Sequence, residues 1–118
     1  MKTMVTGCPA EFTLKMIGGR WKIFIVHQLL EGTLRFSELQ RRINGLSANV
    51  VTPKMLTQEL RQMEADGLVL RTVYPEVPPR VEYSLTPMGC SLEPVVEAMV
   101  EWGRRLEREF GIPVEHCK

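Results

Sequence analysis

The stretch TPKMLTQELRQMEADG, residues 52–67, decides the fold because it specifies a helix together with both of its ends. Thr52 can cap the helix, and Pro53 suits the first helical position, where its missing N–H costs nothing. Gly67 suits a left-handed stop after the last turn. The sequence therefore predicts a helix from Pro53 to Asp66.

The two faces of this helix differ in character. Leu56, Leu60 and Met63 recur at the spacing of one apolar stripe. The opposite side carries side chains suited to hydrogen bonding, namely Lys54, Gln58 and Arg61, with Thr57 at the margin. Lysine and arginine reach phosphates or guanine, glutamine pairs with adenine, and threonine contacts the thymine methyl group. This row indicates a helix that enters the major groove of DNA.

A solvated surface is the alternative for the same face. Three acidic residues of the stretch, Glu59, Glu64 and Asp66, outnumber Lys54 and Arg61. Taken alone, the helix therefore favours a plain surface role. The flanking sequence changes that balance.

A second helix is predicted just before the first. In SELQRRI, residues 37–43, Ser37 and Gln40 have the spacing of a capping box, and Leu39 and Ile43 face inward. Residues 44–51 contain Asn-Gly and Ser, which predict a turn. Two helices in tandem form a helix-turn-helix, here about 37–66, although this link is longer than the usual turn of about 3 to 4 residues.

After Gly67 the pattern becomes β-like. Residues 69–74 and 81–85 are rich in β-branched and aromatic side chains, and three prolines separate them. We expect a hairpin over about 69–85, with Glu76 and Arg80 at its tip. A hairpin directly after a recognition-type helix is typical of a wing, and a plain structural hairpin is the alternative.

Helices are also predicted at both ends of the chain. Residues 9–17 form about two turns, and residues 20–31 are apolar almost all round, which indicates a buried helix. The region 87–110 carries an apolar stripe of about five turns, which Pro94 should kink or delay near its start. Because so long a stripe exceeds what a small core covers, we expect part of it to pack on a second copy. The residues expected there are Val95, Met99, Trp102 and Leu106.

Length and composition indicate one ordinary globular unit. The chain has 118 residues, 44% hydrophobic and 25% charged, enough for a single domain over residues 1–118 with one modest core. No apolar run reaches the roughly 18 to 20 residues of a membrane span, and the first residues lack an apolar signal core. These features favour a cytoplasmic protein without membrane association.

The net charge of +1 does not by itself indicate nucleic-acid binding, but the charged residues are unevenly distributed along the chain. Residues 20–51 carry a local excess of three positive charges, and residues 86–118 a local excess of two negative charges. This asymmetry favours a phosphate-binding side and a separate partner-binding side. Arg35 and Arg41 are the candidate phosphate contacts.

Motifs for catalysis or metal binding are not found. The sequence contains no CxxC, HxxxH or GxSxG, so no enzyme activity, metal or cofactor is expected. His27 fits a partly buried histidine of a core helix. The three cysteines, Cys8, Cys90 and Cys117, are expected to be thiols rather than disulfide partners.

Cys8 precedes a proline-started helix, where amide groups and the helix dipole favour a thiolate. We therefore expect it to be the most reactive of the three cysteines, with Cys90 disfavoured by burial. A buried, space-filling thiol under the first helix is the alternative for Cys8. If the ends of two subunits interleave, Cys8 could approach Cys117 of a second copy.

Several of these motifs occur together in a known order. A resemblance to the HxlR-type winged helix-turn-helix transcriptional regulators of bacteria is carried by residues 8–32, the motif RFSELQRRI, residues 52–69 and residues 71–89. The resemblance covers roughly residues 7–103. The chain departs from the family's pattern between Gly45 and Thr52, where a few residues look additional.

The resemblance implies a mainly α fold with a β-hairpin wing and further N- and C-terminal helices that form a homodimer. It implies specific binding to double-stranded DNA, with a groove-reading set formed by Lys54, Thr57, Gln58 and Arg61 and a wing contact from Arg80. Some members respond to oxidants or electrophiles through the cysteine before the first proline, here Cys8. The alternative from a different class is a protein-interaction module that uses the winged helix to hold a partner.

Overall fold

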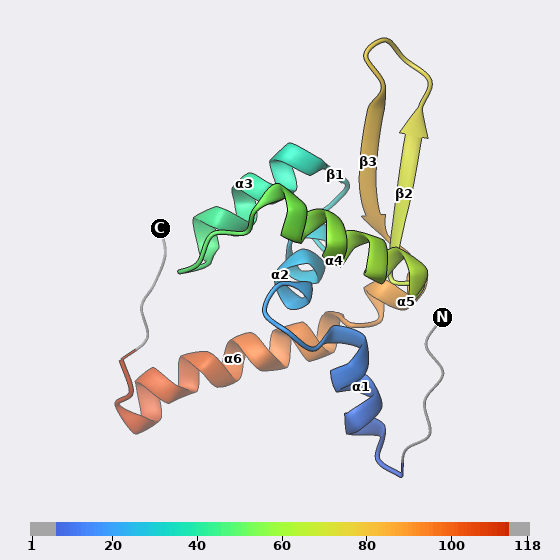
Figure 1. Ribbon diagram of the computed structural model, residues 1–118. Coiled ribbons are helices and arrows are strands. Elements are labelled where there is room, and N and C mark those ends of the chain that lie inside the picture. The colour runs from blue at the N-terminus through green and yellow to red at the C-terminus, as the bar shows by residue number, and fades with distance from the viewer. Residues whose placement is uncertain (1–6, 114–118) are drawn as a thin grey trace.

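The computed structural model describes residues 7–113 as six helices and three short strands (Figure 1). The helices are α1 (Pro9–Ile17), α2 (Lys22–Leu29), α3 (Phe36–Leu46), α4 (Pro53–Ala65), α5 (Pro87–Cys90) and α6 (Glu93–Phe110). The strands are β1 (Leu34–Arg35), β2 (Val69–Tyr74) and β3 (Arg80–Leu85). The predicted fold class, mainly α with a small β-hairpin wing, is confirmed. Within residues 7–113, none of the helices is both long and apolar enough to cross a membrane.

Helix α4 has the ends that the sequence indicates. The Thr52 hydroxyl accepts a hydrogen bond from the Met55 N–H at 3.2 Å. Gly67 follows with φ of 81°, in the left-handed region that glycine adopts without a steric cost. Between these ends Leu56, Leu60 and Met63 are buried, each with at most 1% exposure. The apolar stripe thus anchors α4 to the core and leaves its other face outside.

The start of α3 differs from the expectation. The helix begins at Phe36, so Arg35 is the N-cap, and the Arg35 N–H donates to Glu38 Oε1 at 3.0 Å. The capping box predicted for Ser37 and Gln40 is therefore wrong. Glu38 lies three residues after Arg35, so its carboxylate accepts from the N-cap N–H as in one half of a capping box, two positions earlier than predicted. Gln40 instead donates through Nε2 to the Val51 carbonyl at 3.2 Å.

The link between α3 and α4 is shorter than predicted. Helix α3 continues through the Asn-Gly pair to Leu46, so only residues 47–52 connect the two helices. Asn44 fixes this link, because its Oδ1 accepts from the Val51 N–H at 2.8 Å. Val51 itself is fully buried. The link is thus tied to α3 and packed into the core.

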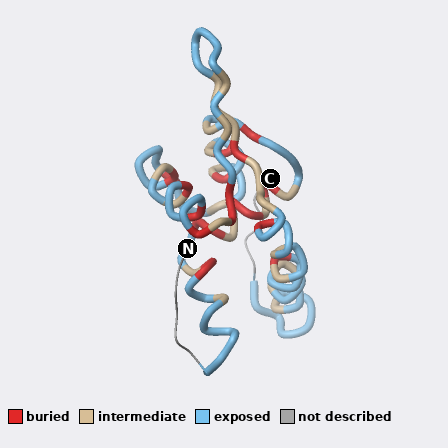
Figure 2. Tube along the Cα trace, turned by 90° about the vertical axis from the view of Figure 1, so that its right-hand side faces the viewer, coloured by how far each residue is buried: buried red, intermediate tan, exposed pale blue. Residues whose placement is uncertain are grey.

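Helix α2 lies at the centre of the core. Ile25, Val26 and Leu29 are at most 4% exposed, in agreement with a helix that is apolar almost all round. Lys22 is also buried, and its Nζ lies 3.9 Å from Glu59 Oε2 of α4. Figure 2 shows the buried residues gathered in the middle of the molecule, with α1 and α6 largely exposed.

The sheet is antiparallel, with strand order β1-β3-β2. Strands β2 and β3 pair from Val69 with Leu85 to Tyr74 with Arg80, and β1 adds the pair of Leu34 with Tyr83. The β2–β3 hairpin projects well beyond the helices (Figure 1). The hairpin is therefore placed directly beside the C-terminal end of α4, as a wing.

Pro94 delays the last helix, as the sequence indicates. Thr86 caps the four-residue α5, the chain turns at Ser91 and Leu92, and α6 then begins with Pro94 in its first turn. The Thr86 hydroxyl also donates to the Gly67 carbonyl at 2.6 Å, which joins α5 to the end of α4. Beyond this junction α6 extends past the helical body (Figure 1).

Candidate nucleic-acid interface

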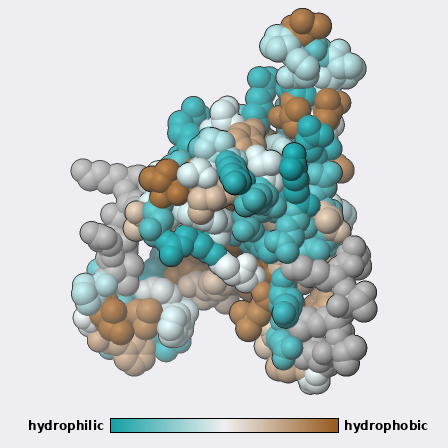
Figure 3. All heavy atoms as spheres, in the orientation of Figure 1, coloured by the Kyte–Doolittle hydropathy of each residue, from teal (hydrophilic) through white to brown (hydrophobic). Residues whose placement is uncertain are grey.

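The outer face of α4 is open to solvent. Lys54, Gln58 and Arg61 are exposed, and Thr57 is half-buried at the margin. Within residues 7–113 none of these four side chains makes a hydrogen bond or ion pair with another residue. Their donors are thus available to an outside partner. Figure 3 shows hydrophilic residues gathered over the α3 and α4 face.

The acidic residues of α4 do not neutralise the positive charge of this face. Glu59 turns toward the buried Lys22 and is half-buried, and Asp66 is only 4% exposed. Of the three acidic residues that favoured a solvated surface, only Glu64 is exposed on the helix. The surface left by folding therefore has two basic side chains, Lys54 and Arg61, against one acidic one.

A cleft of about 390 Å³ separates α4 from the wing. Thr57, Arg61 and Glu64 line it from α4, and Arg71 and Tyr83 line it from the sheet. Arg71 is exposed and makes no ion pair among the described residues. The sequence interpretation missed Arg71, although the two-residue period of a strand places it on the same face as the buried Val69. The cleft thus brings two unpaired guanidinium groups to one side.

Arg80, the expected wing contact, is held by its neighbours. Its guanidinium lies 3.9 Å from the centre of the Tyr74 ring. Its Nε is 3.3 Å from Glu76 Oε2, and its Nη1 is 3.5 Å from Glu82 Oε2. Two carboxylates therefore offset its charge, which sets it apart from Arg71 on the other strand.

Two arginines of the α3 region extend the basic surface. Arg35 and Arg41 are exposed, and neither forms an ion pair in the part of the chain that the structure describes. Arg42 differs, since its Nη1 contacts Glu31 Oε2 at 3.1 Å. The charge that remains unpaired is therefore that of Arg35 and Arg41.

Helix α6 presents an apolar face that the rest of the chain leaves uncovered. Val96 is buried against α2, whereas Met99 is 50% and Trp102 59% exposed. Val95 and Leu106 are half-buried on the same side as Met99 and Trp102. Pro94, Val95, Ala98, Met99 and Trp102 line a shallow groove there, of about 570 Å³.

Ion pairs connect the charged side chains on the polar side of α6. Arg105 pairs with Glu109 at 3.0 Å, and Arg108 pairs with Glu101 at 3.0 Å. The hydrogen bond to Glu101 raises the pKa of Arg108. All four groups are exposed, so these pairs add little stability.

Two of the three cysteines fall within the described residues, and Cys117 lies outside them. Cys8 is the N-cap of α1 and is exposed, which contradicts the space-filling alternative for this chain. Cys90 is also exposed, so the expectation that burial protects it is wrong. It ends the short α5, where the chain turns outward before α6. Within residues 7–113, no cluster of three or more metal-binding side chains occurs.

Sequence comparison assigns the chain to a family. The family described as HxlR-like helix-turn-helix matches residues 16–109. The HTH-type transcriptional regulator YybR of Bacillus subtilis is 50% identical over 97 residues, which cover 82% of this chain and 74% of YybR. This likeness favours a DNA-binding regulator over an interaction module and over an enzyme.

Solved structures agree with this assignment. The redox regulator HypR in its reduced form has a TM-score of 0.77 and 47% identity, covering 87% of this chain and 96% of HypR. The reduced transcriptional regulator YodB of B. subtilis has a TM-score of 0.70 and 34% identity, covering 85% of this chain and 94% of YodB. Together with the exposed recognition-type helix and its wing, these matches show that the chain is a winged helix-turn-helix transcriptional regulator of the HxlR family.

Proposed function

We propose that the whole chain acts as one domain that pairs into a homodimer and reads an operator with two copies of α4. The observation that supports this most strongly is the outer face of α4, where Lys54, Gln58 and Arg61 are exposed and unpaired. In a two-fold dimer, each α4 enters the major groove of one half-site, about one helical turn from the other. Such a regulator has to reach the DNA that it controls, which favours the cytoplasm.

The surrounding basic groups position the helix. Arg35 and Arg41 contact the phosphates on the α3 side, and Arg71 contacts the backbone that passes between α4 and the wing. Because Glu76 and Glu82 offset its charge, Arg80 adds less at the wing tip than Arg71 does. Contacts of this kind set orientation and affinity without reading sequence.

Replacing Arg71 with alanine is therefore expected to weaken binding to operator and unrelated DNA alike. Loss of one phosphate contact reduces the slope of log affinity against log salt by about 1. Fluorescence anisotropy from low to moderate salt measures this slope. Arg105→Ala on α6 serves as the matched control and should leave the slope unchanged. A variant Arg71→Ala with the slope of the original protein would rule out the contact.

The dimer is formed through α6. Met99 and Trp102 are at least half exposed on its uncovered face. Exposure of so apolar a face to water is unfavourable, which marks it as an interaction surface. Pairing two copies along this face buries the same residues from both chains, which is the form of a two-fold interface.

A response to oxidants or electrophiles is proposed for Cys8. Two observations support it: the exposed position at the N-terminus of α1, and the likeness to HypR, which is a redox regulator with solved oxidised and reduced forms. The amide groups and dipole of α1 favour the thiolate form of a cysteine placed there. Helices α1 and α6 both lie at the end of the molecule away from the wing (Figure 1), so modification of Cys8 would act at the end that carries the proposed dimer face.

Cys8 is accordingly expected to react faster than Cys90 with a maleimide or iodoacetamide reagent. Both residues are exposed, so the difference comes from their places on their helices: Cys8 precedes α1, and Cys90 ends α5. Mass spectrometry of a short labelling time course measures both rates. In parallel, mild oxidation should release DNA from the original protein and not from the variant Cys8→Ser. Equal labelling rates, together with unaltered oxidative release in Cys8→Ser, would exclude Cys8 as the sensor.

A further inference from the structure

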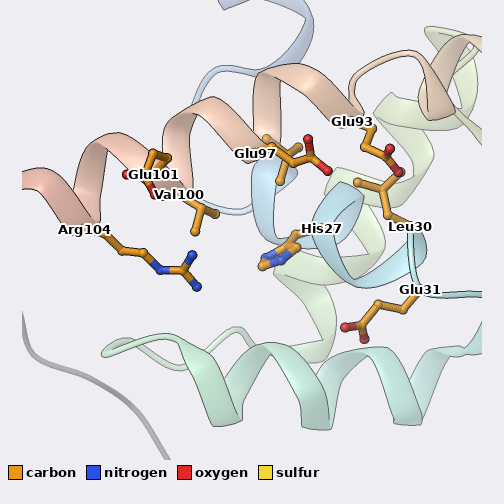
Figure 4. A pocket seen from close by; sticks show the side chains of 9 residues that line it. His27, Leu30, Glu31, Glu93, Glu97, Val100, Glu101 and Arg104 are labelled. Atoms are coloured by element: carbon orange, nitrogen blue, oxygen red, sulfur yellow. The ribbon is translucent and has the colours of Figure 1, made fainter.

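A cavity of about 490 Å³ lies between α2 and α6 (Figure 4). Leu30, Val96 and Val100 give it an apolar surface, and His27 stands between the two helices. Its size falls in the range of about 300 to 1,000 Å³ typical of small-molecule sites. It is also set apart from the α4 surface assigned to DNA.

The charged groups around this cavity fall into two kinds. Glu31 and Glu101 line it but already pair with arginines, Arg42 at 3.1 Å and Arg108 at 3.0 Å. Three others, Glu93, Glu97 and Arg104, make no ion pair or hydrogen bond with any described residue. The imidazole of His27 likewise has no such partner among residues 7–113. The cavity thus holds unpaired groups of both signs.

These unpaired groups are separated along the cavity. Figure 4 shows Glu93 and Glu97 toward the N-terminal end of α6, while the Arg104 side chain comes from the other end and points toward His27. Glu97 and Arg104 are seven positions apart, which corresponds to about 10 Å along the helix at 1.5 Å per residue. The apolar residues Val96 and Val100 lie between them in sequence and line the same cavity.

We propose that this cavity binds a small zwitterion, with an ammonium group at one end, a carboxylate at the other and an apolar segment between. Glu93 and Glu97 hold the ammonium group, and Arg104 with His27 holds the carboxylate. A simple organic cation would leave Arg104 without an anion, and a simple carboxylic acid would face Glu93 and Glu97. A molecule with both charges makes a charge-assisted contact at each end, and a singly charged molecule makes only one of the two.

The cavity lies between the proposed dimer helix, α6, and the helix that contacts α4. Glu93, Glu97 and Arg104 lie on the side of α6 opposite Met99 and Trp102, so pairing through the apolar face leaves this side uncovered. The other wall is α2, which contacts α4 through Lys22 and Glu59. A bound molecule therefore bridges the proposed dimer helix and the support of the recognition helix. Binding itself does not depend on the role assigned to α4.

A matched set of probes tests the proposal: 6-aminohexanoate, hexylamine and hexanoate, titrated into the full-length protein at constant ionic strength. Nuclear magnetic resonance of the His27 ring reports occupancy of the cavity without DNA. We expect 6-aminohexanoate to shift this resonance in a saturable manner and to bind at least about tenfold more tightly than either singly charged probe. Equal affinity for hexylamine or hexanoate, or no saturable shift with any probe, would overturn the proposal.

Variants assign the two ends. Glu97→Gln and Arg104→Gln should each reduce the affinity for 6-aminohexanoate about tenfold, since each removes one charge-assisted contact. The controls are Glu11→Gln on α1 and Arg105→Gln on α6, which make the same chemical changes away from the cavity. If either cavity variant binds as the original protein does, the assignment of that end is wrong. Because DNA is absent, these outcomes are independent of the operator experiments.

Discussion

Replacing Trp102 with glutamate is expected to convert the protein from a dimer to a monomer. Trp102 is 59% exposed in the single chain and stands in the middle of the apolar face of α6. In a two-fold interface the change acts twice and places two carboxylates in apolar surroundings, where an unpaired charge is strongly unfavourable. Truncating an aromatic residue at the centre of an interface commonly costs at least about 2 kcal/mol, and an introduced charge adds to this.

Sedimentation velocity at micromolar concentration measures the change. The original protein should sediment as a dimer and Trp102→Glu as a monomer, whereas Trp102→Ala should shift the equilibrium by a smaller amount. Arg108→Glu is the control, because it introduces the same residue on the same helix at a position that does not share the face of Trp102. A monomeric original protein, or a Trp102→Glu variant that remains dimeric, would refute the interface.

The second large effect concerns the recognition surface. The combined change of Lys54, Gln58 and Arg61 to alanine is expected to abolish specific binding, with a loss of at least about 100-fold. Each good contact to a base contributes about 1 to 3 kcal/mol of discrimination, and three such contacts are removed together. The fold should persist, because all three side chains are exposed and alanine is the best helix former.

Competition between an operator duplex and unrelated DNA in an anisotropy titration separates a loss of specific binding from a general loss of positive charge. Lys15→Ala with Arg105→Ala removes two positive charges elsewhere and serves as the control. The α4 variant should lose its preference for the operator, and the control should keep it. Unchanged operator preference in the α4 variant would show that another surface reads the sequence.

The sequence predicts much of the helix-turn-helix because its signals are local. The ends of α4 follow from Thr52, Pro53 and Gly67, and its buried side follows from the spacing of its apolar residues. The strand boundaries likewise follow from β-branched and aromatic runs interrupted by prolines. Each of these features depends on residues within a few positions of one another, so a single sequence is enough to find them.

The errors arise where distant residues decide the outcome. Helix α3 runs through the Asn-Gly pair because Asn44 bonds to Val51 across the link, a contact that turn propensity does not include. Arg80 is engaged by Tyr74, Glu76 and Glu82 only once the hairpin forms. The same holds for Arg71, whose place opposite α4 depends on how the wing packs. Whether Cys90 is exposed depends on how the chain turns between α5 and α6.

The most direct test of the central assignment is a methylation-interference experiment with dimethyl sulfate. The duplex should first be selected from a random pool by the purified protein, since this needs no prior operator. Methylation of guanine N7 reports the major groove, and methylation of adenine N3 reports the minor groove. The account predicts interference at guanine N7 in two symmetric clusters about 10 base pairs apart, with individual positions lost in Arg61→Ala. Interference confined to adenine N3, or a pattern that Arg61→Ala leaves unchanged, would contradict the reading of DNA by α4.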